Sequence, residues 1–376
     1  MGVTKRCVNF FRFNFFWLDN GKCKDVVEES WRSQNITGWM GFVLKEKLKG
    51  VKERLKVWNR EEYGVMDDRI AKLKEDIEEV DVRGELVLLS EKDIHTRKDS
   101  MVVQRSRIKW IQECDANTSF FHMCLKSRMR RNGLRALKVN DMWVHTPVDV
   151  RRAVVEYFRN QVTSEVGERP RLDGVSFQRI SEGKNTRLVM PFLSEEIEMV
   201  TKESEGNKSP GPDGFNFAFF KKFWNLMKDE VMIFFDQFHA NEVIPKSLSA
   251  YFVTLIPKVS SPMSMKEFWP ISLLGSIYKL LAKVLGKRLA GVMDSIISKS
   301  QPAFVKGRNL VGGVLVANEM VDFAKKTKRE VLVLKVDFEK TCDTVDWGFL
   351  EYMMGRLGFA TMWVAWMKAC VCGGSM

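Results

Sequence analysis

The sequence has few residues of the types that form compact metal sites or disulfide frameworks. Its 376 residues include four histidines, which stand apart from one another, so we expect neither a histidine metal cluster nor a nucleophile–base pair. Seven cysteines, an odd and scattered set, argue against a disulfide framework and for a reducing compartment. No apolar run reaches the roughly 18 residues of a transmembrane helix, and no small-residue cleavage site of a signal peptide follows the aromatic-rich start. These features predict an intracellular protein, nuclear or cytoplasmic.

Positive charge exceeds negative charge along the chain. Lysine and arginine number 60 against 48 aspartates and glutamates, which gives a formal net charge of +12. This balance favours a polyanionic partner, most simply nucleic acid, over an anionic membrane surface, for which no lipid-binding signal is present. The densest positive segment is 101–140, and the alternative reading of it is a solvated helix face. The nucleic-acid contacts predicted there are Lys126, Arg128, Arg130 and Arg131.

Hydrophobic periodicity predicts a mixture of helices and strands. Alternating aromatic residues in 11–17 predict a strand with one buried face. The proline-free segment 38–95 predicts two long amphipathic helices, and the prolines and glycines of Ser209–Gly214 predict a rigid turn. Further helices are expected at Val148–Phe158, after a cap at Ser194, within Phe219–Phe238, and at Tyr278–Val292, Val314–Lys325 and Thr361–Cys370, with a strand at Tyr251–Ile256.

The segment Val331–Trp347 carries the strongest local signal for chemistry. Its β-branched run ends at Asp337, which predicts a buried strand with a carboxylate at its mouth, followed by a helix capped by Asp343 or Thr344. A carboxylate in that place is costly to desolvate unless a cation meets it, and a divalent metal is one such cation. Read alone, an aspartate that ends a strand is more often a turn or capping residue.

Within that segment, LKVDFEKTCDTVDW resembles the first catalytic block of reverse transcriptases from non-LTR retrotransposons (the long interspersed element type), in a plant-like form. Further blocks resemble the same family and occur in the family's order. They are Asn207–Phe215, Thr254–Lys258, Phe268–Leu273, Tyr278–Leu289 and Ser300–Asn309. Upstream, SRIKWIQECDANTSFFH resembles the block that precedes the fingers of these enzymes.

The resemblance implies an α+β fold, made of the fingers and part of the palm of a right-hand polymerase after a mostly helical N-terminal region. It implies no endonuclease activity, because the catalytic residues of that domain would lie upstream. The implied units are a remnant of the endonuclease domain at 1–35, a helical linker at 36–100, a basic helical region and connector at 101–190, reverse transcriptase fingers at 191–325 and a truncated palm at 326–376.

The resemblance also implies functional residues and partners. Asp337 would be catalytic and would bind magnesium or manganese together with the backbone carbonyl of Phe338. RNA template and DNA primer would be the partners. Lys258, Trp269 and Cys342 are implied to bind nucleotide, and Arg308 is implied to bind nucleic acid.

Three departures from the family's pattern argue for a poor enzyme. Trp269 stands where an arginine is usual, and an indole cannot clamp phosphate as a guanidinium does. Cys342 is too small to replace the aromatic residue that closes the sugar pocket. The Asp-Asp pair of the second catalytic block does not follow Asp337, so we expect an inactive portion of a reverse transcriptase. A non-enzymatic nucleic-acid-binding protein derived from a retrotransposon, and a pseudogene product without a biochemical role, are the alternatives.

Overall fold

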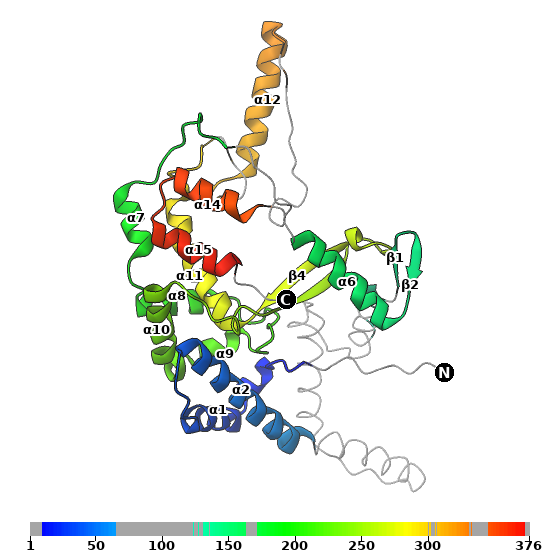
Figure 1. Cartoon of the computed structure of the whole chain (residues 1–376), viewed down its shortest axis with the longest axis vertical. Coiled ribbons are helices and arrows are strands. Elements are labelled where there is room, and N and C mark those ends of the chain that lie inside the picture. Colours follow the sequence, from blue (N-terminus) through cyan, green and yellow to red (C-terminus); the bar gives the residue numbers. More distant parts are fainter. Residues whose placement is uncertain are drawn as a thin grey trace, which may run out of the picture.

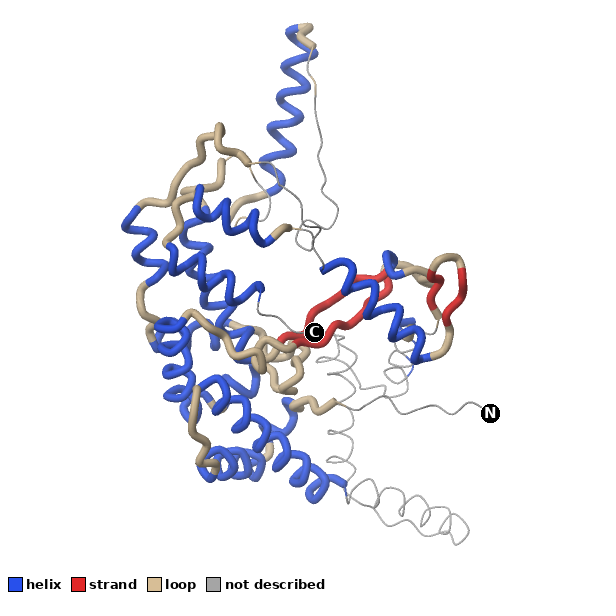
Figure 2. The backbone as a smooth tube through the Cα atoms, in the orientation of Figure 1, coloured by secondary structure: helices blue, strands red, loops and turns tan. Residues whose placement is uncertain are grey.

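The structure is a computed structural model, and it describes residues 10–64, 123, 127, 131–134, 136–162, 171–299, 301, 305, 307–330, 332 and 345–372. Helices dominate these residues, and two small antiparallel hairpins supply their strands (Figure 1; Figure 2). This combination of helices and small antiparallel sheets agrees with the predicted α+β class. The predicted division into fingers and palm, and the domain limits, stay predictions.

The N-terminal helices form one side of the main core. In chain order they are η1 (Phe15–Asp19), α1 (Gly21–Ser33), α2 (Met40–Asn59) and the π-helical turn η2 (Arg60–Gly64). The helix α1 packs against α2, and α2 packs against α10 (Trp224–Asn241). The first helix predicted within 38–95 is therefore confirmed, and the second lies outside the described residues. The apolar residues at helical spacing in α2 are all buried: Leu44, Leu48, Val51, Leu55 and Trp58.

The strand predicted at 11–17 is wrong. The chain is extended only as far as Asn14, where the amide of Phe13 donates to the carbonyl of Gly214 at 2.8 Å. It then turns into η1, because the Asn14 side chain accepts a backbone hydrogen bond at the start of that helix. Phe13 and Trp17 are nevertheless buried, with their rings edge to face at 5.4 Å. The alternation identified core residues but not the element that carries them.

The helices between residues 182 and 293 supply many of the buried residues of the main core. They are α7 (Glu182–Val189), α8 (Ser194–Glu203), α9 (Phe217–Lys222), α10 and α11 (Ser276–Met293). The core predicted in Phe219–Phe238 is confirmed, with a break at Phe223 between α9 and α10. The cap predicted at Ser194 is wrong, because Leu193 occupies the N-cap position and Ser194 is the first helical residue.

A second, smaller core joins the two hairpins. Strands β1 (Leu137–Val139) and β2 (Met142–Val144) form one hairpin, and β3 (Tyr251–Pro257) and β4 (Phe268–Leu274) form the other, with the short η4 (Met265–Glu267) before β4. Helix α6 (Pro147–Val162) confirms the helix predicted at Val148–Phe158 and packs on the β3–β4 hairpin. The buried residues of this core are Leu137, Val150, Phe158, Met265 and Phe268.

Three C-terminal helices complete the described chain. Helices α14 (Trp347–Arg356) and α15 (Thr361–Cys372) pack on each other, and α15 buries Trp363 and Trp366 in the main core. The cap predicted at Asp343 or Thr344 is wrong, because Asp346 accepts the hydrogen bond from the first turn of α14 at 2.8 Å. Helix α12 (Leu310–Thr327) extends away from the rest of the molecule (Figure 1).

Candidate nucleic-acid interface

The β3–β4 hairpin presents two different faces. Val253 and Leu255 on β3 pack toward α6, because their side chains alternate with those of their neighbours. The opposite face carries Thr254 and Ile256, paired with Ile271 and Trp269 on β4. The hairpin therefore has one face that packs on α6 and one face that is open.

Lys258 and Trp269, which the sequence assigned to nucleotide binding, lie together at the end of this hairpin. The Lys258 amide donates to the carbonyl of Glu267 at 2.8 Å, and this extends the strand pairing by one residue. The Lys258 ammonium lies 4.3 Å from the centre of the Trp269 ring and donates to the carbonyl of Lys266 at 2.8 Å. The Trp269 side chain is 59% exposed, so a ligand could reach it.

The proline- and glycine-rich turn is fixed to the start of α11 by one buried carboxylate. Asp213 Oδ2 accepts hydrogen bonds from the Ser276 amide at 2.5 Å and from the Ser276 hydroxyl at 2.6 Å, and Oδ1 accepts from the Phe215 amide at 3.3 Å. Gly275 occupies the N-cap position of α11 and has no side chain, so Asp213 supplies the missing cap from a distant loop. Burial raises the pKa of the Asp213 carboxyl, against the lowering effect of these hydrogen bonds.

Two further contacts hold this turn against the junction of β4 and α11. A methyl group on Gly211 would lie 2.1 Å from the carbonyl oxygen of Leu274, so only glycine allows this approach. The Lys279 ammonium donates to the carbonyl of Ser209 at 3.0 Å, and its burial lowers the pKa of Lys279. The rigid turn predicted at Ser209–Gly214 is thus also a tertiary joint.

The four cations of α11 each contact another part of the chain. Besides Lys279, the Lys283 ammonium lies 5.4 Å from the centre of the Phe217 ring. Lys287 pairs with Glu203 at 2.8 Å. These contacts give α11 a structural role that its charge pattern does not reveal.

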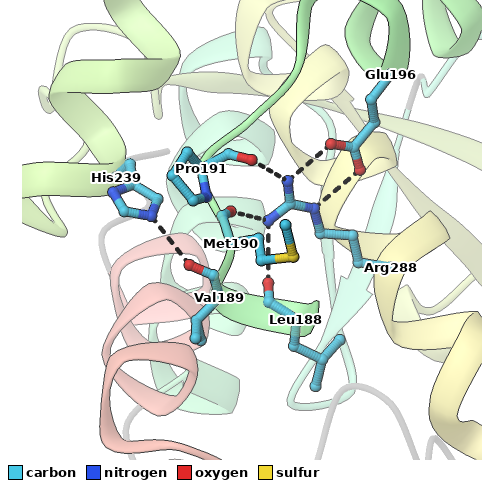
Figure 3. Close-up of polar contacts among 7 residues, drawn as sticks. All are labelled: Leu188, Val189, Met190, Pro191, Glu196, His239 and Arg288. Atoms are coloured by element: carbon cyan, nitrogen blue, oxygen red, sulfur yellow. Dashed lines mark hydrogen bonds and ion pairs between the residues drawn. The ribbon is translucent and has the colours of Figure 1, made fainter. Parts of the chain in front are cut away.

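Arg288 is the most constrained cation of α11 (Figure 3). Its Nε and Nη2 donate to the two oxygens of Glu196 at 2.9 and 2.7 Å, and its guanidinium lies 4.2 Å from the centre of the Phe192 ring. The remaining donors reach backbone carbonyls at the end of α7 and in the connection to α8. These carbonyls belong to Leu188 at 3.0 Å, Met190 at 2.6 Å and Pro191 at 3.1 Å.

Arg308, predicted to contact nucleic acid, also uses all five of its N–H donors internally. Nε and Nη2 donate to Asp294 Oδ1 at 3.1 and 3.0 Å. A phosphate contact would have to replace one of these bonds, so the nucleic-acid role of Arg308 stays a prediction. The other acceptors are the carbonyls of Ile297 at 2.9 Å, Ser298 at 2.5 Å and Gln301 at 2.7 Å.

The remaining predicted site residues are mostly beyond the described part of the chain. Arg131 is helical and exposed. Within the described residues no group of three His, Cys, Asp or Glu side chains could hold a metal ion, and no helix is long and apolar enough to cross a membrane. The predicted residues outside the described ranges are Lys126, Arg128, Arg130, Asp337, Phe338 and Cys342.

Sequence reasoning missed the residues that hold this region together. Asp213 belongs to a recognisable turn motif, but nothing in the sequence pairs it with Ser276, 63 positions later. The partners of Arg288 are mainly backbone carbonyls, which leave no signature in a sequence.

Comparison with known proteins supports the resemblance over this part of the chain. Residues 256–375 match the family described as "Reverse transcriptase (RNA-dependent DNA polymerase)". The chain is 27% identical over 271 residues to the "Transposon TX1 uncharacterized 149 kDa protein" of Xenopus laevis, and the match covers 70% of this chain and 20% of that relative. The chain thus spans about a fifth of the length of this relative, and the plant-like character stays a prediction. The C-terminal third of the chain, residues 256–375, thus matches the reverse transcriptase family, and the longer similarity is to a transposon protein.

Proposed function

We propose that this chain is the fingers and part of the palm of an RNA-directed DNA polymerase, and that it binds an RNA template with a DNA primer. The observation that carries the proposal is the meeting of Lys258 and Trp269 on an exposed hairpin at the start of the matched domain. A lysine there suits contact with a triphosphate, as a point charge. Asp337 would bind magnesium or manganese, and Cys342 would line the pocket for the sugar of the incoming nucleotide.

The 376-residue polypeptide by itself binds nucleic acid without extending a primer. Two-metal phosphoryl transfer needs several carboxylates around two cations. Asp337 supplies one, and no adjacent pair of aspartates follows it in this sequence. The other acidic residues near it in the sequence, Glu339 and Asp343, are too close along the chain to stand on a separate strand.

A non-enzymatic nucleic-acid-binding role is the second candidate, and the net charge of +12 favours it. Both candidates require phosphate contacts by the basic segment 126–131. The two candidate functions make different predictions when the rest of a polymerase domain is added. Only the polymerase candidate then predicts primer extension.

The binding test is a fluorescence anisotropy titration of the full chain with a labelled single-stranded RNA at several salt concentrations. We expect the logarithm of the affinity to fall linearly with the logarithm of salt concentration, with a slope of about 0.7 per neutralised phosphate. Replacing Arg128, Arg130 and Arg131 together by alanine should flatten that slope for every RNA sequence.

A matched triple variant controls for the loss of positive charge. Lys202, Lys208 and Lys368 are well exposed and each pairs with a glutamate, so their replacement by alanine should leave the slope nearly unchanged. If both triple variants bound RNA as the unmodified chain does, segment 126–131 would have no part in binding.

A further inference from the structure

One face of the β3–β4 hairpin carries exposed aromatic and aliphatic side chains. We call it the open hairpin face, because α6 covers the other side. Trp269 is 59% exposed and Ile271 46% exposed on this face, and none of its residues carries a carboxylate. It consists of Phe252, Thr254, Ile256, Trp269, Ile271 and Leu273.

Aromatic rings stand at both ends of the open hairpin face. At one end the Phe10 ring lies 4.6 Å from the Phe252 ring, and Phe10 is 58% exposed. At the other end Trp269 pairs with Ile256, four residues along β3 from Phe252. The rise of a strand places these two aromatic sites about 13 Å apart on one surface.

A cation lies at the Trp269 site, and a second stands close in sequence to the Phe10 site. The Lys258 ammonium lies over the Trp269 ring at 4.3 Å, and Arg12 is exposed two residues after Phe10. Neither cation forms an ion pair with another described residue. The face therefore combines exposed rings, positive charge and no acidic side chain, and this combination complements a polyanion with free aromatic surfaces.

We propose that the open hairpin face binds single-stranded nucleic acid by stacking unpaired bases on Trp269 and on the Phe10–Phe252 pair. The inference rests on the proposed function, because it names how the same hairpin would hold a strand. Trp269 stands where the resembling family usually has arginine, so this chain would exchange a phosphate clamp for a base-stacking surface. A paired duplex offers no free base, so it would not use these rings.

The test compares two labelled 12-residue oligonucleotides of equal charge, one of oligo-uridine and one of abasic sites, in anisotropy titrations of the full chain. We expect Trp269→Ala to weaken uridine binding about tenfold and Phe10→Ala by a similar factor, with the salt slope unchanged. Trp269→Phe should retain most of the affinity. Binding of the abasic strand should be the same for all of these variants.

Trp143→Ala is the matched control, because Trp143 is 54% exposed on β2 of the other hairpin. It should change binding of neither strand. Thermal unfolding of each variant checks that it folds. In addition, the affinities of the unmodified chain for the uridine strand and the abasic strand test base stacking without any substitution.

Equal affinity of the unmodified chain for both strands would overturn the stacking proposal while leaving phosphate binding, and so the proposed function, intact. No binding of either strand would overturn both. If Trp269→Ala left RNA binding unchanged but turned a dimer into a monomer in sedimentation, a second copy of the chain would be the occupant of this face.

Discussion

The guanidinium of Arg288 and the carboxylate of Glu196 form a two-bond ion pair that joins α11 to α8, with N–O distances of 2.9 and 2.7 Å. Only 10% of the Arg288 side chain is exposed, against 23% for Glu196. The same guanidinium donates to three carbonyls at the end of α7 and just after it, while His239 on α10 contacts the carbonyl of Val189 at 3.0 Å from the other side (Figure 3). One side chain therefore fixes the spacing of three helices around the core.

Replacing Arg288 by methionine should lower the free energy of unfolding by about 3 kcal/mol or more, since it leaves Glu196 and three carbonyls without their donor. Arg288→Lys should recover only part of that loss, because an ammonium cannot serve five acceptors in one plane. Urea denaturation measures both. Its neighbour Lys287 forms an exposed pair with Glu203, so Lys287→Met should cost less than about 1 kcal/mol. Equal losses for Arg288→Met and Lys287→Met would contradict the central role of Arg288.

Glycine at position 211 should be indispensable for the joint between the turn and α11. Gly211→Ala would place a methyl group 2.1 Å from a backbone oxygen, and we expect a loss of about 2 kcal/mol or more in the free energy of unfolding. Gly291→Ala is the control, because Gly291 lies inside α11 with open space around it. It should stabilise the helix by about 0.5–1 kcal/mol. The midpoints of thermal or urea unfolding should therefore shift down for Gly211→Ala and up for Gly291→Ala.

The pH dependence of stability should report the burial of Asp213. Its pKa is raised by burial, so the native state holds the proton at pH values where the unfolded state has released it. The contribution of Asp213 to the free energy of unfolding is then fully present below its ordinary pKa of about 3.9 and is lost as pH rises through the raised value.

Asp213→Asn removes this titration. The difference in the free energy of unfolding, unmodified chain minus variant, should decrease as pH rises from about 4. Urea midpoints measured at a series of pH values give that difference. A difference that grew with rising pH would show instead that Ser276, Phe215 and Lys279 hold the carboxyl as an anion.

Helix α12 should tolerate polar substitution where α11 does not. Val314 is 60% exposed and Leu315 57% exposed, so Val314→Gln with Leu315→Gln should change the free energy of unfolding by less than about 1 kcal/mol. Leu280→Gln on α11 is the control, because Leu280 is fully buried and its replacement should cost several kcal/mol, on the order of 3. A large loss of stability for the α12 variant would show that these side chains are covered in solution.

Periodicity predicted the elements whose burial repeats along a single helix or strand. Leu44, Leu48 and Leu55 recur at helical spacing, and the sequence placed α2 from them because one face of that helix meets the core. The strand predicted at Tyr251–Ile256 and the helix predicted at Tyr278–Val292 are likewise present, as β3 and α11.

Elements whose shape depends on distant partners were not predictable. The turn after Asn14 depends on a side-chain cap and on a backbone bond from Phe13 to Gly214, which are 201 positions apart in sequence numbering. Arg308 was predicted as a nucleic-acid contact because a sequence shows its charge but not the carbonyls that use its donors, and the carbonyl partners of Arg288 are equally invisible in the sequence. Lys258 and Trp269, both predicted to bind nucleotide, do lie together, since strand pairing across a short hairpin brings them close, and their role stays a prediction.

The central proposal, that this polypeptide binds a primed RNA template without extending the primer, is tested by binding and primer extension in the same sample. A purified, monodisperse chain is titrated with labelled RNA template annealed to a DNA primer, and magnesium or manganese and deoxynucleotides are then added. We predict salt-dependent binding with no extension above background. Absence of binding, or extension that disappears in Asp337→Asn, would contradict the account.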